Sequence, residues 1–219
     1  NTVLIIASLK ENWDIVKYLV EKGADVNTKF NYKNNYNNFA EPVKSKTALI
    51  IASEKENWEM VKYLVEKGAS NINDALTYAT ISRNLELVKY LVEKGANNIN
   101  SALLDATING CCEIVKYLIE SGADVNTKNK YNKTVLMLAL EKENWEIVKY
   151  LIEKGADNID YALSIALKKE NWELVKYLVE KGADVNTEYK DGYNESKTAL
   201  MLASEKENWE IVKYLIESG

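Results

Sequence analysis

The sequence of 219 residues contains no histidine, one proline, two cysteines and two phenylalanines. Without histidine, the chain lacks the usual general base near neutral pH and the commonest side-chain ligand of transition metals. No apolar run approaches the roughly 20 residues that a transmembrane helix needs, and the opening residues lack the basic region of a signal peptide. The net charge of −5 argues against nucleic acid as a main partner, because phosphate binding needs a basic surface.

The two cysteines, Cys111 and Cys112, are adjacent. Neighbouring cysteines rarely form a sound disulfide, and two thiols without histidine make a poor zinc site. We therefore expect the two cysteines to be small apolar side chains that fill space in the core of a protein from a reducing, cytoplasmic compartment. We expect no metal and no other cofactor. The sequence also has no nucleophile–base pair and no glycine-rich phosphate loop. We expect no catalytic residues and no enzyme activity.

What the sequence does contain is a repeat built around the tripeptide Lys-Tyr-Leu. Its tyrosines are Tyr18, Tyr63, Tyr90, Tyr117, Tyr150, Tyr177 and Tyr214. A longer frame, ENWEIVKYLIEKGAD at 143–157, recurs with it, which predicts one array over residues 1–219 rather than two domains. The predicted repeats are 1–27, 47–73, 74–100, 101–127, 134–160, 161–187 and 198–219.

Each repeat is predicted to contain two helices. In the second, Ile147, Val148 and Leu151 form an apolar stripe, Asn144 stands at the N-cap and Gly155 follows the last turn. In the first, short helix the expected N-caps are Thr47, Thr134 and Thr198, with Asp74 and Ser101 taking that role in two other repeats. Helix pairs this short cannot bury their apolar faces alone, so the repeats must stack.

The tyrosines of the Lys-Tyr-Leu frame are expected to lie half-buried between repeats, with their hydroxyls in solvent. The lysines beside them, and the Glu-Lys strings that end each first helix, are expected to be solvated surface. These charged strings could still contribute charge selectivity to a partner site.

The pattern T-A-L-x-x-A-x-x-x-x-N-W-E-I-V-K-Y-L-V-E-K-G-A-D-V-N resembles the ankyrin repeat over essentially the whole chain. The resemblance implies an all-α solenoid of helix-turn-helix repeats with irregular β-turn fingers. It also implies a non-catalytic scaffold that binds another protein through its concave face and fingers. Two features depart from the family: its T-P-L-H becomes T-A-L-I or T-[AV]-L-M, and its glycine between the helices survives only as Gly110, with Glu56 and Glu143 among the replacements.

The repeat lengths predict three fingers of unequal size, at 28–46, 126–133 and 187–197. Three other repeats are six residues shorter than the usual ankyrin repeat of about 33. Their connections from Gly68, Gly95 and Gly155 to the next helix therefore leave no room for a finger.

The fingers are the predicted partner-binding site. Their candidate residues are Phe30, Tyr32, Tyr36, Phe39, Lys128, Lys130, Tyr131, Tyr189 and Tyr193. The first two fingers each carry a net charge of +3, and aromatic and cationic side chains are enriched at binding hot spots, so we expect an acidic or aromatic partner segment. Two alternatives stay open: a structural spacer within a longer repeat array, and an anionic-ligand or nucleic-acid reader that uses the basic fingers.

Overall fold

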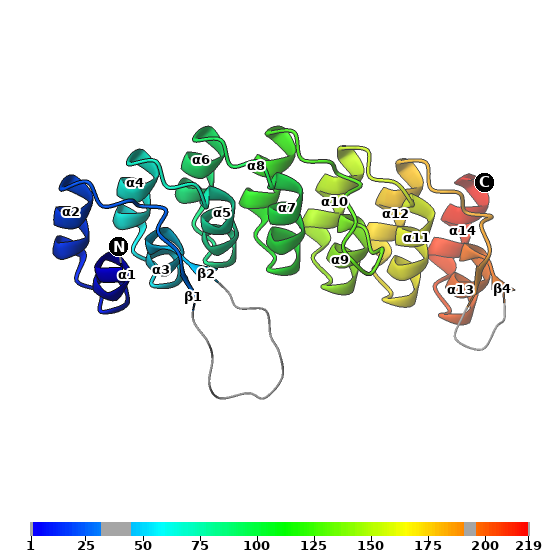
Figure 1. Cartoon of the computed structure of the whole chain (residues 1–219). Coiled ribbons are helices and arrows are strands. Elements are labelled where there is room, and N and C mark those ends of the chain that lie inside the picture. Colours follow the sequence, from blue (N-terminus) through cyan, green and yellow to red (C-terminus); the bar gives the residue numbers. More distant parts are fainter. Residues whose placement is uncertain (1, 32–44, 191–195, 219) are drawn as a thin grey trace, which may run out of the picture. The chain divides into compact units, whose positions relative to one another are not determined.

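The computed structural model describes residues 2–31, 45–190 and 196–218 (Figure 1). Two compact units, Asn1–Asn109 and Gly110–Gly219, divide the chain between the seventh and eighth helices. The described residues form helices with two short β-hairpins, which confirms the all-α prediction. We call the first helix of each repeat its A helix and the second its B helix.

The first compact unit holds seven of the described helices. They are α1 (Thr2–Leu9), α2 (Trp13–Glu21), α3 (Ala48–Glu54), α4 (Trp58–Glu66), α5 (Ile72–Ile81), α6 (Leu85–Glu93) and α7 (Ile99–Ile108). One hairpin, β1 (Phe30–Asn31) paired with β2 (Ser45–Lys46), precedes α3.

The second compact unit holds the other seven. They are α8 (Cys112–Glu120), α9 (Val135–Glu141), α10 (Trp145–Glu153), α11 (Ile159–Lys168), α12 (Trp172–Glu180), α13 (Ala199–Glu205) and α14 (Trp209–Ser218). The hairpin of β3 (Tyr189–Lys190) with β4 (Ser196–Lys197) precedes α13, and a single bridge, Lys128 to Thr134, precedes α9. These paired residues lie within or directly beside the predicted fingers at 28–46, 126–133 and 187–197.

The B helices begin and end as predicted. The Asn144 side chain accepts a hydrogen bond from the Ile147 amide at 3.2 Å, and Asn12, Asn57, Asn84, Asn171 and Asn208 cap their helices in the same way. At the other end, Gly155 has a φ of +84°, a left-handed conformation that glycine adopts without steric cost.

The A helices confirm part of the capping prediction. Thr47, Thr134 and Thr198 each accept a hydrogen bond from the amide three residues on. Asp74 and Ser101 are not caps, and that prediction was wrong: α5 and α7 begin earlier, after Asn71 and Asn98. The missing finger is replaced by extra helix, since α5, α7 and α11 have 10 residues whereas α3, α9 and α13 have 7.

The longer A helices also keep a loop contact that the finger-bearing repeats make. After α2, the Asn27 side-chain oxygen accepts a hydrogen bond from the Ser70 amide of the next repeat at 2.7 Å. Where the finger is missing, Asn73 in the first turn of α5 accepts from the Asn97 amide at 2.9 Å, and Asp160 in α11 accepts from the Asp184 amide at 2.7 Å. In repeats without a finger, a side chain of the A helix, Asn73 or Asp160, thus accepts the hydrogen bond that the loop residue Asn27 accepts in a finger-bearing repeat.

The glutamates that replace glycine between the A and B helices adopt left-handed backbone conformations, with φ of +53° at both Glu56 and Glu143. Such a conformation costs a non-glycine residue about 1–2 kcal/mol. The side chain in return contacts the next repeat: Lys169 forms an ion pair with Glu143 at 2.6 Å, and the Ser82 hydroxyl donates to Glu56 at 3.0 Å. The departure from glycine therefore links neighbouring repeats.

The tyrosines of the B helices form a second set of contacts between repeats. The Tyr177 hydroxyl donates to the Lys149 carbonyl of the preceding B helix at 3.1 Å, and Tyr63, Tyr90, Tyr150 and Tyr214 make the equivalent bond. The Lys149 and Lys181 ammonium groups lie 5.6 and 5.5 Å from the centroid of the Tyr177 ring. These five tyrosines are half-buried, as expected, and their hydroxyls also bond the preceding repeat, which the sequence did not predict. We call this set of hydrogen bonds the tyrosine ladder.

Removal of one hydroxyl should measure what a step of the tyrosine ladder contributes. We expect Tyr177→Phe to lower the free energy of unfolding by about 0.5–1.5 kcal/mol, because it removes the hydroxyl proton that the Lys149 carbonyl and the Glu153 carboxylate share. Urea denaturation followed by circular dichroism measures the change. Tyr131→Phe is the matched control, since that side chain is 70% exposed on a finger. Equal costs for the two variants would contradict the role assigned to the ladder.

Alkaline pH should weaken the Tyr177 step of the tyrosine ladder and also the hydrogen bond that the Tyr78 hydroxyl of α5 donates to Glu54. Burial and the neighbouring Glu153 raise the pKa of Tyr177 to about 12, and burial and a hydrogen bond to Glu54 raise the pKa of Tyr78 to about 12. The stabilisation is complete below the ordinary pKa of 10.0 and is lost as pH rises towards 12, because the unfolded chain releases these protons first. We expect the melting temperature to fall over this range, and to fall less in Tyr78→Phe/Tyr177→Phe. Identical pH profiles for the variant and the parent chain would refute this assignment.

Candidate partner-binding surface

The structure describes only part of the predicted finger site. Phe30 lies in β1, where it pairs with Lys46, and Tyr189 lies in β3, where it pairs with Lys197. Lys128, Lys130 and Tyr131 of the second finger are described completely. The remaining predicted residues, Tyr32, Tyr36, Phe39 and Tyr193, lie outside the described residues.

A lysine at the end of each finger is held by the A helix that follows it. Lys46 pairs with Glu54 at 2.6 Å, Lys133 with Glu141 at 2.5 Å, and Lys197 with Glu205 at 2.8 Å. The positive charge expected for the first two fingers is therefore smaller than the sequence suggests, since Lys46 and Lys133 are each matched by a carboxylate. The eight-residue spacing of lysine and glutamate in all three finger-bearing repeats is a signal in the sequence that our prediction of the site did not use.

The second finger is a tight turn organised by Asn129. Its side-chain oxygen accepts hydrogen bonds from the amides of Tyr131 and Lys133, at 2.9 and 3.1 Å, and Asn132 follows with a φ of +60°. This Asx-type turn presents Tyr131 to solvent with 70% of its surface exposed. The Lys130 ammonium group lies 5.0 Å from the centre of the Tyr131 ring. The turn therefore displays an aromatic and a cationic side chain together.

Repeats without a finger expose apolar side chains at the corresponding A-helix ends. Where α3 has the paired Glu54, α5 and α7 have Ile81 and Ile108, which are 51% and 40% exposed. In the second compact unit, the position is taken by Lys168 at the end of α11, and Tyr161 on the same helix is 40% exposed. None of these four was among the predicted site residues. The change from glutamate to isoleucine or lysine in the short repeats was the available signal.

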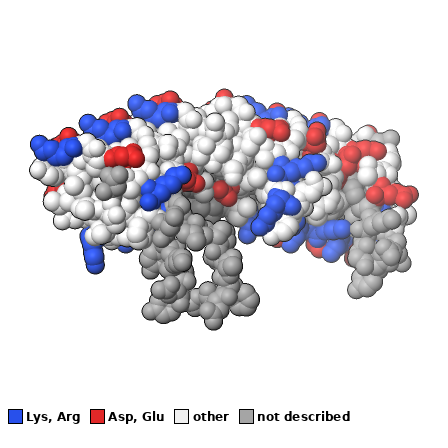
Figure 2. Space-filling view, viewed as in Figure 1, with Lys and Arg blue, Asp and Glu red and all other residues white. Residues whose placement is uncertain are grey.

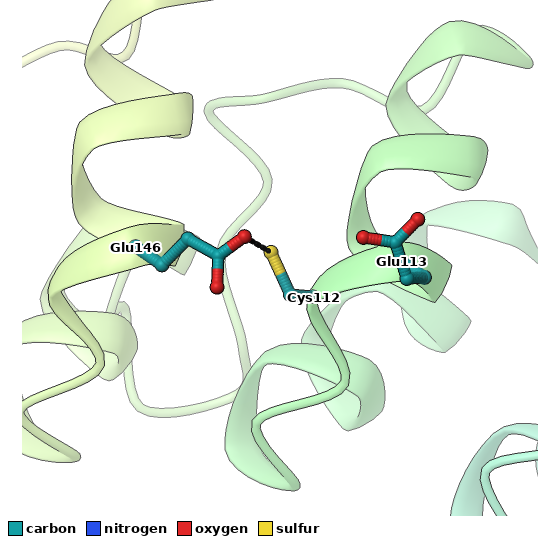
Figure 3. A group of neighbouring side chains, drawn as sticks. All are labelled: Cys112, Glu113 and Glu146. Carbon is teal, nitrogen blue, oxygen red and sulfur yellow. Dashed lines mark hydrogen bonds between the residues drawn. The ribbon is translucent and has the colours of Figure 1, made fainter.

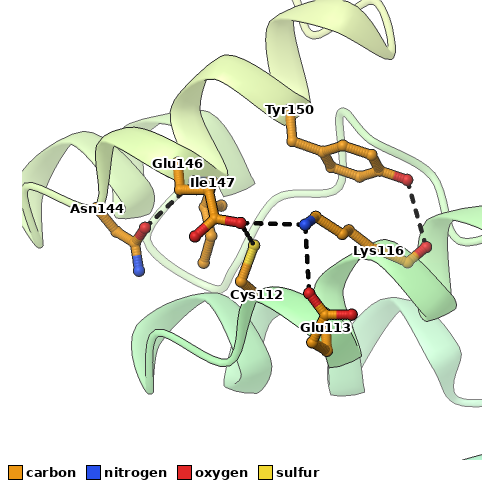
Figure 4. A network of polar contacts seen from close by, with 7 residues as sticks. All are labelled: Cys112, Glu113, Lys116, Asn144, Glu146, Ile147 and Tyr150. Carbon is orange, nitrogen blue, oxygen red and sulfur yellow. Dashed lines mark hydrogen bonds and ion pairs between the residues drawn. The ribbon is translucent and has the colours of Figure 1, made fainter.

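A separate polar cluster surrounds Cys112, which replaces the tryptophan found at this position in five other repeats. Figure 3 shows Cys112 and Glu113 in the first turn of α8 and Glu146 reaching towards them from α10. The Cys112 thiol donates to the Glu146 carboxylate at 3.0 Å, and the Lys116 ammonium donates to Glu146 at 3.0 Å and to Glu113 at 3.2 Å (Figure 4). The cluster thus joins two successive B helices, in addition to the Tyr150 bond to the Lys116 carbonyl.

The Cys112 cluster suits a structural role better than metal binding. Its sulfur and the two carboxylates lie within 4.8 Å of one another, which is close enough for a shared ion. However, Lys116 already supplies a cation to both carboxylates. Burial, followed by the hydrogen bond to Glu146, raises the pKa of the Cys112 thiol to about 11, whereas a metal ligand must be a thiolate.

Comparison with protein families follows the repeat pattern. The family model described as "Ankyrin repeats (3 copies)" matches residues 29–102, 97–160 and 157–219, and the model described as "Ankyrin repeat" matches residues 1–31. No curated protein matches the chain. Among the described residues, no helix combines the length and apolar content that a membrane crossing requires.

The reactivity of Cys112 tests the polar cluster. At pH 8 we expect slow alkylation by iodoacetamide, because the raised pKa keeps the sulfur protonated. Glu146→Gln removes the negative charge that helps to raise this pKa, so the rate should increase several-fold. The Cys111→Ala background confines the reaction to one thiol, and Glu173→Gln on a neighbouring B helix is the matched control. The cluster would be disproved by a rate that Glu146→Gln leaves unchanged.

Proposed function

Because the chain belongs to the ankyrin repeat family, we propose that it is a non-catalytic scaffold that binds a partner protein through its fingers and the adjoining ends of its A helices. Ankyrin repeats are in general protein–protein interaction modules and typically have no catalytic activity. In this proposal, residues 1–219 act as one array of seven repeats. A reducing, cytoplasmic setting belongs to the proposal and is supported by Cys111 and Cys112, both of which are thiols.

One observation carries the proposal: the two sides of the repeats use their side chains differently. On the B helices, tyrosine hydroxyls and rings are engaged by the neighbouring repeat through the tyrosine ladder. The B helices from α4 to α12 expose no large apolar side chain, whereas α2 and α14 expose Tyr18 and Ile216. At the fingers and on the A helices of the interior repeats, by contrast, large apolar and aromatic side chains project into solvent. They include Ile81 and Ile108 in the first compact unit, and Tyr131 and Tyr161 in the second.

Exposed side chains of this kind supply binding energy when a partner covers them. A fully buried isoleucine contributes about 1.5–3 kcal/mol through the hydrophobic effect. Tyrosine adds contact area at a small cost in conformational entropy, and it is enriched at binding hot spots. Ile81 and Ile108 on the first unit, and Tyr131 and Tyr161 on the second, are therefore the proposed contact residues. Phe30 remains a candidate from the sequence and is half-buried beside Lys46.

Affinity capture with the purified chain as bait tests this function. Two double variants test the contact residues: Ile81→Ser/Ile108→Ser and Tyr131→Ser/Tyr161→Ser. We expect at least one of them to reduce the amount of a captured protein by at least about tenfold, because hot-spot residues contribute about 2 kcal/mol or more each. Quantitative mass spectrometry measures the loss.

Tyr18→Ser/Ile216→Ser is the matched control, since those side chains are 55% and 62% exposed on B helices. It should retain the captured protein. The proposal fails if the control loses the partner and both test variants keep it, or if no protein is captured specifically.

A further inference from the structure

We propose that the second compact unit binds an acidic segment of the partner on a surface that we call the lysine surface. It consists of Lys128, Lys130 and Tyr131 from the second finger, Lys142 at the end of α9, and Tyr161 and Lys168 from α11. This inference rests on the proposed function and adds to it a location and a class of partner.

Two ion pairs bring the parts of the lysine surface together. Lys133 at the end of the finger contacts Glu141, the last residue of α9, at 2.5 Å. Lys169, which follows α11, contacts Glu143 just beyond α9 at 2.6 Å. The finger and the C-terminal ends of α9 and α11 are thereby neighbours, and Lys142 lies between the two paired glutamates in the sequence.

The same ion pairs leave an excess of positive charge on this surface. Glu141 and Glu143 are each matched by a lysine, and Glu170 is matched by Lys206 at 2.7 Å. Within the part of the chain that the structure describes, the four lysines of the lysine surface have no carboxylate within the 4.0 Å of an ion pair; these are Lys128, Lys130, Lys142 and Lys168. All four are exposed. A chain of net charge −5 therefore carries a local excess of positive charge here.

Figure 2 shows lysine and arginine side chains gathered along the lower edge of the second compact unit, where α9 and the finger before it lie in Figure 1. The corresponding A-helix ends of the first compact unit present Ile81 and Ile108 instead. The excess of lysine is thus a local property of certain repeats and not a feature of the repeat pattern.

Aromatic side chains among the lysines favour a protein segment as the occupant. Tyr131 is 70% exposed beside Lys130, and Tyr161 lies on the same face of α11 as Lys168, because residues seven apart are two helical turns apart. Carboxylates of an extended segment can pair with the lysines while its apolar side chains cover the tyrosine rings. Nucleic acid is expected to bind this surface more weakly than an acidic protein segment. Four lysines beside paired glutamates neutralise few phosphates, and the net negative charge of the protein repels the remaining phosphates.

Fluorescence anisotropy with a labelled oligoglutamate peptide tests the partner class. Oligoglutamine and oligothymidylate of the same length are the comparison probes. We expect oligoglutamate to bind the intact chain in low salt, to weaken as salt increases, and to bind more tightly than either comparison probe.

The decisive variant is Lys128→Glu/Lys130→Glu/Lys168→Glu, which should lose at least about tenfold in affinity for oligoglutamate. Its matched control is Lys154→Glu/Lys181→Glu/Lys213→Glu, which makes the same change in net charge within or directly after B helices and should stay within about twofold. Thermal melting followed by circular dichroism checks that both are folded, and the corresponding Lys→Gln variants replace any that is not.

Equal losses in the two triple variants would overturn the lysine surface, because the attraction would then depend only on net charge. Tighter binding of oligothymidylate than of oligoglutamate would also overturn it, in favour of nucleic acid. If oligoglutamate does not bind, but Tyr131→Ser/Tyr161→Ser still loses a captured protein, this inference fails while the proposed function stands. Failure to capture any protein removes the proposed function itself.

Discussion

Contact between successive repeats is the constraint on which the rest of this structure depends. Each repeat supplies two helices of 7–10 residues, too short to be stable alone or to bury their apolar faces within one repeat. Stacking buries Leu49, Leu76 and Leu136 almost completely. Polar contacts then join the same neighbours: the tyrosine ladder on the B helices, the lysine–glutamate pairs after the A helices, and the asparagine contacts of the loops. The repeated sequence thus supplies both the apolar core and the polar contacts that hold one repeat against the next.

This use of side chains for stacking decides where a partner can bind. The interior B helices α4, α6, α10 and α12 hold their tyrosines against the preceding repeat and expose no large apolar side chain, whereas α2 and α14 expose Tyr18 and Ile216. The A-helix ends and fingers are under less constraint, and there the repeats differ from one another. A finger-bearing repeat ends its A helix with a glutamate that holds the finger lysine, whereas a repeat without a finger has Ile81, Ile108 or Lys168 at that position. A repeat without a finger has no finger lysine to pair with a glutamate, so an apolar or a basic residue can occupy that position.

Signals within a few residues of one another were enough to predict much of the fold. Asn144 as an N-cap and Gly155 as a helix end depend on local backbone geometry, and the structure confirms both. The starts of α5 and α7 were missed because Asp74 and Ser101 are themselves good cap residues, and only the shortened linkage explains why the helix extends back to Asn71 and Asn98. Contacts between residues farther apart in the sequence could not be predicted in this way. The Cys112–Glu146 contact joins residues 34 apart, and the availability of each finger lysine depends on an ion pair formed only after folding.

Hydrogen–deuterium exchange of the chain with and without a bound partner protein tests the central claim most directly, because it reports on both sides of the repeats in one measurement. The account predicts slower exchange in the partner complex at residues 126–133 and in the last turns of α9 and α11, with little change in α10 and α12. Protection confined to α10 and α12, with none at the finger or the A-helix ends, would contradict it.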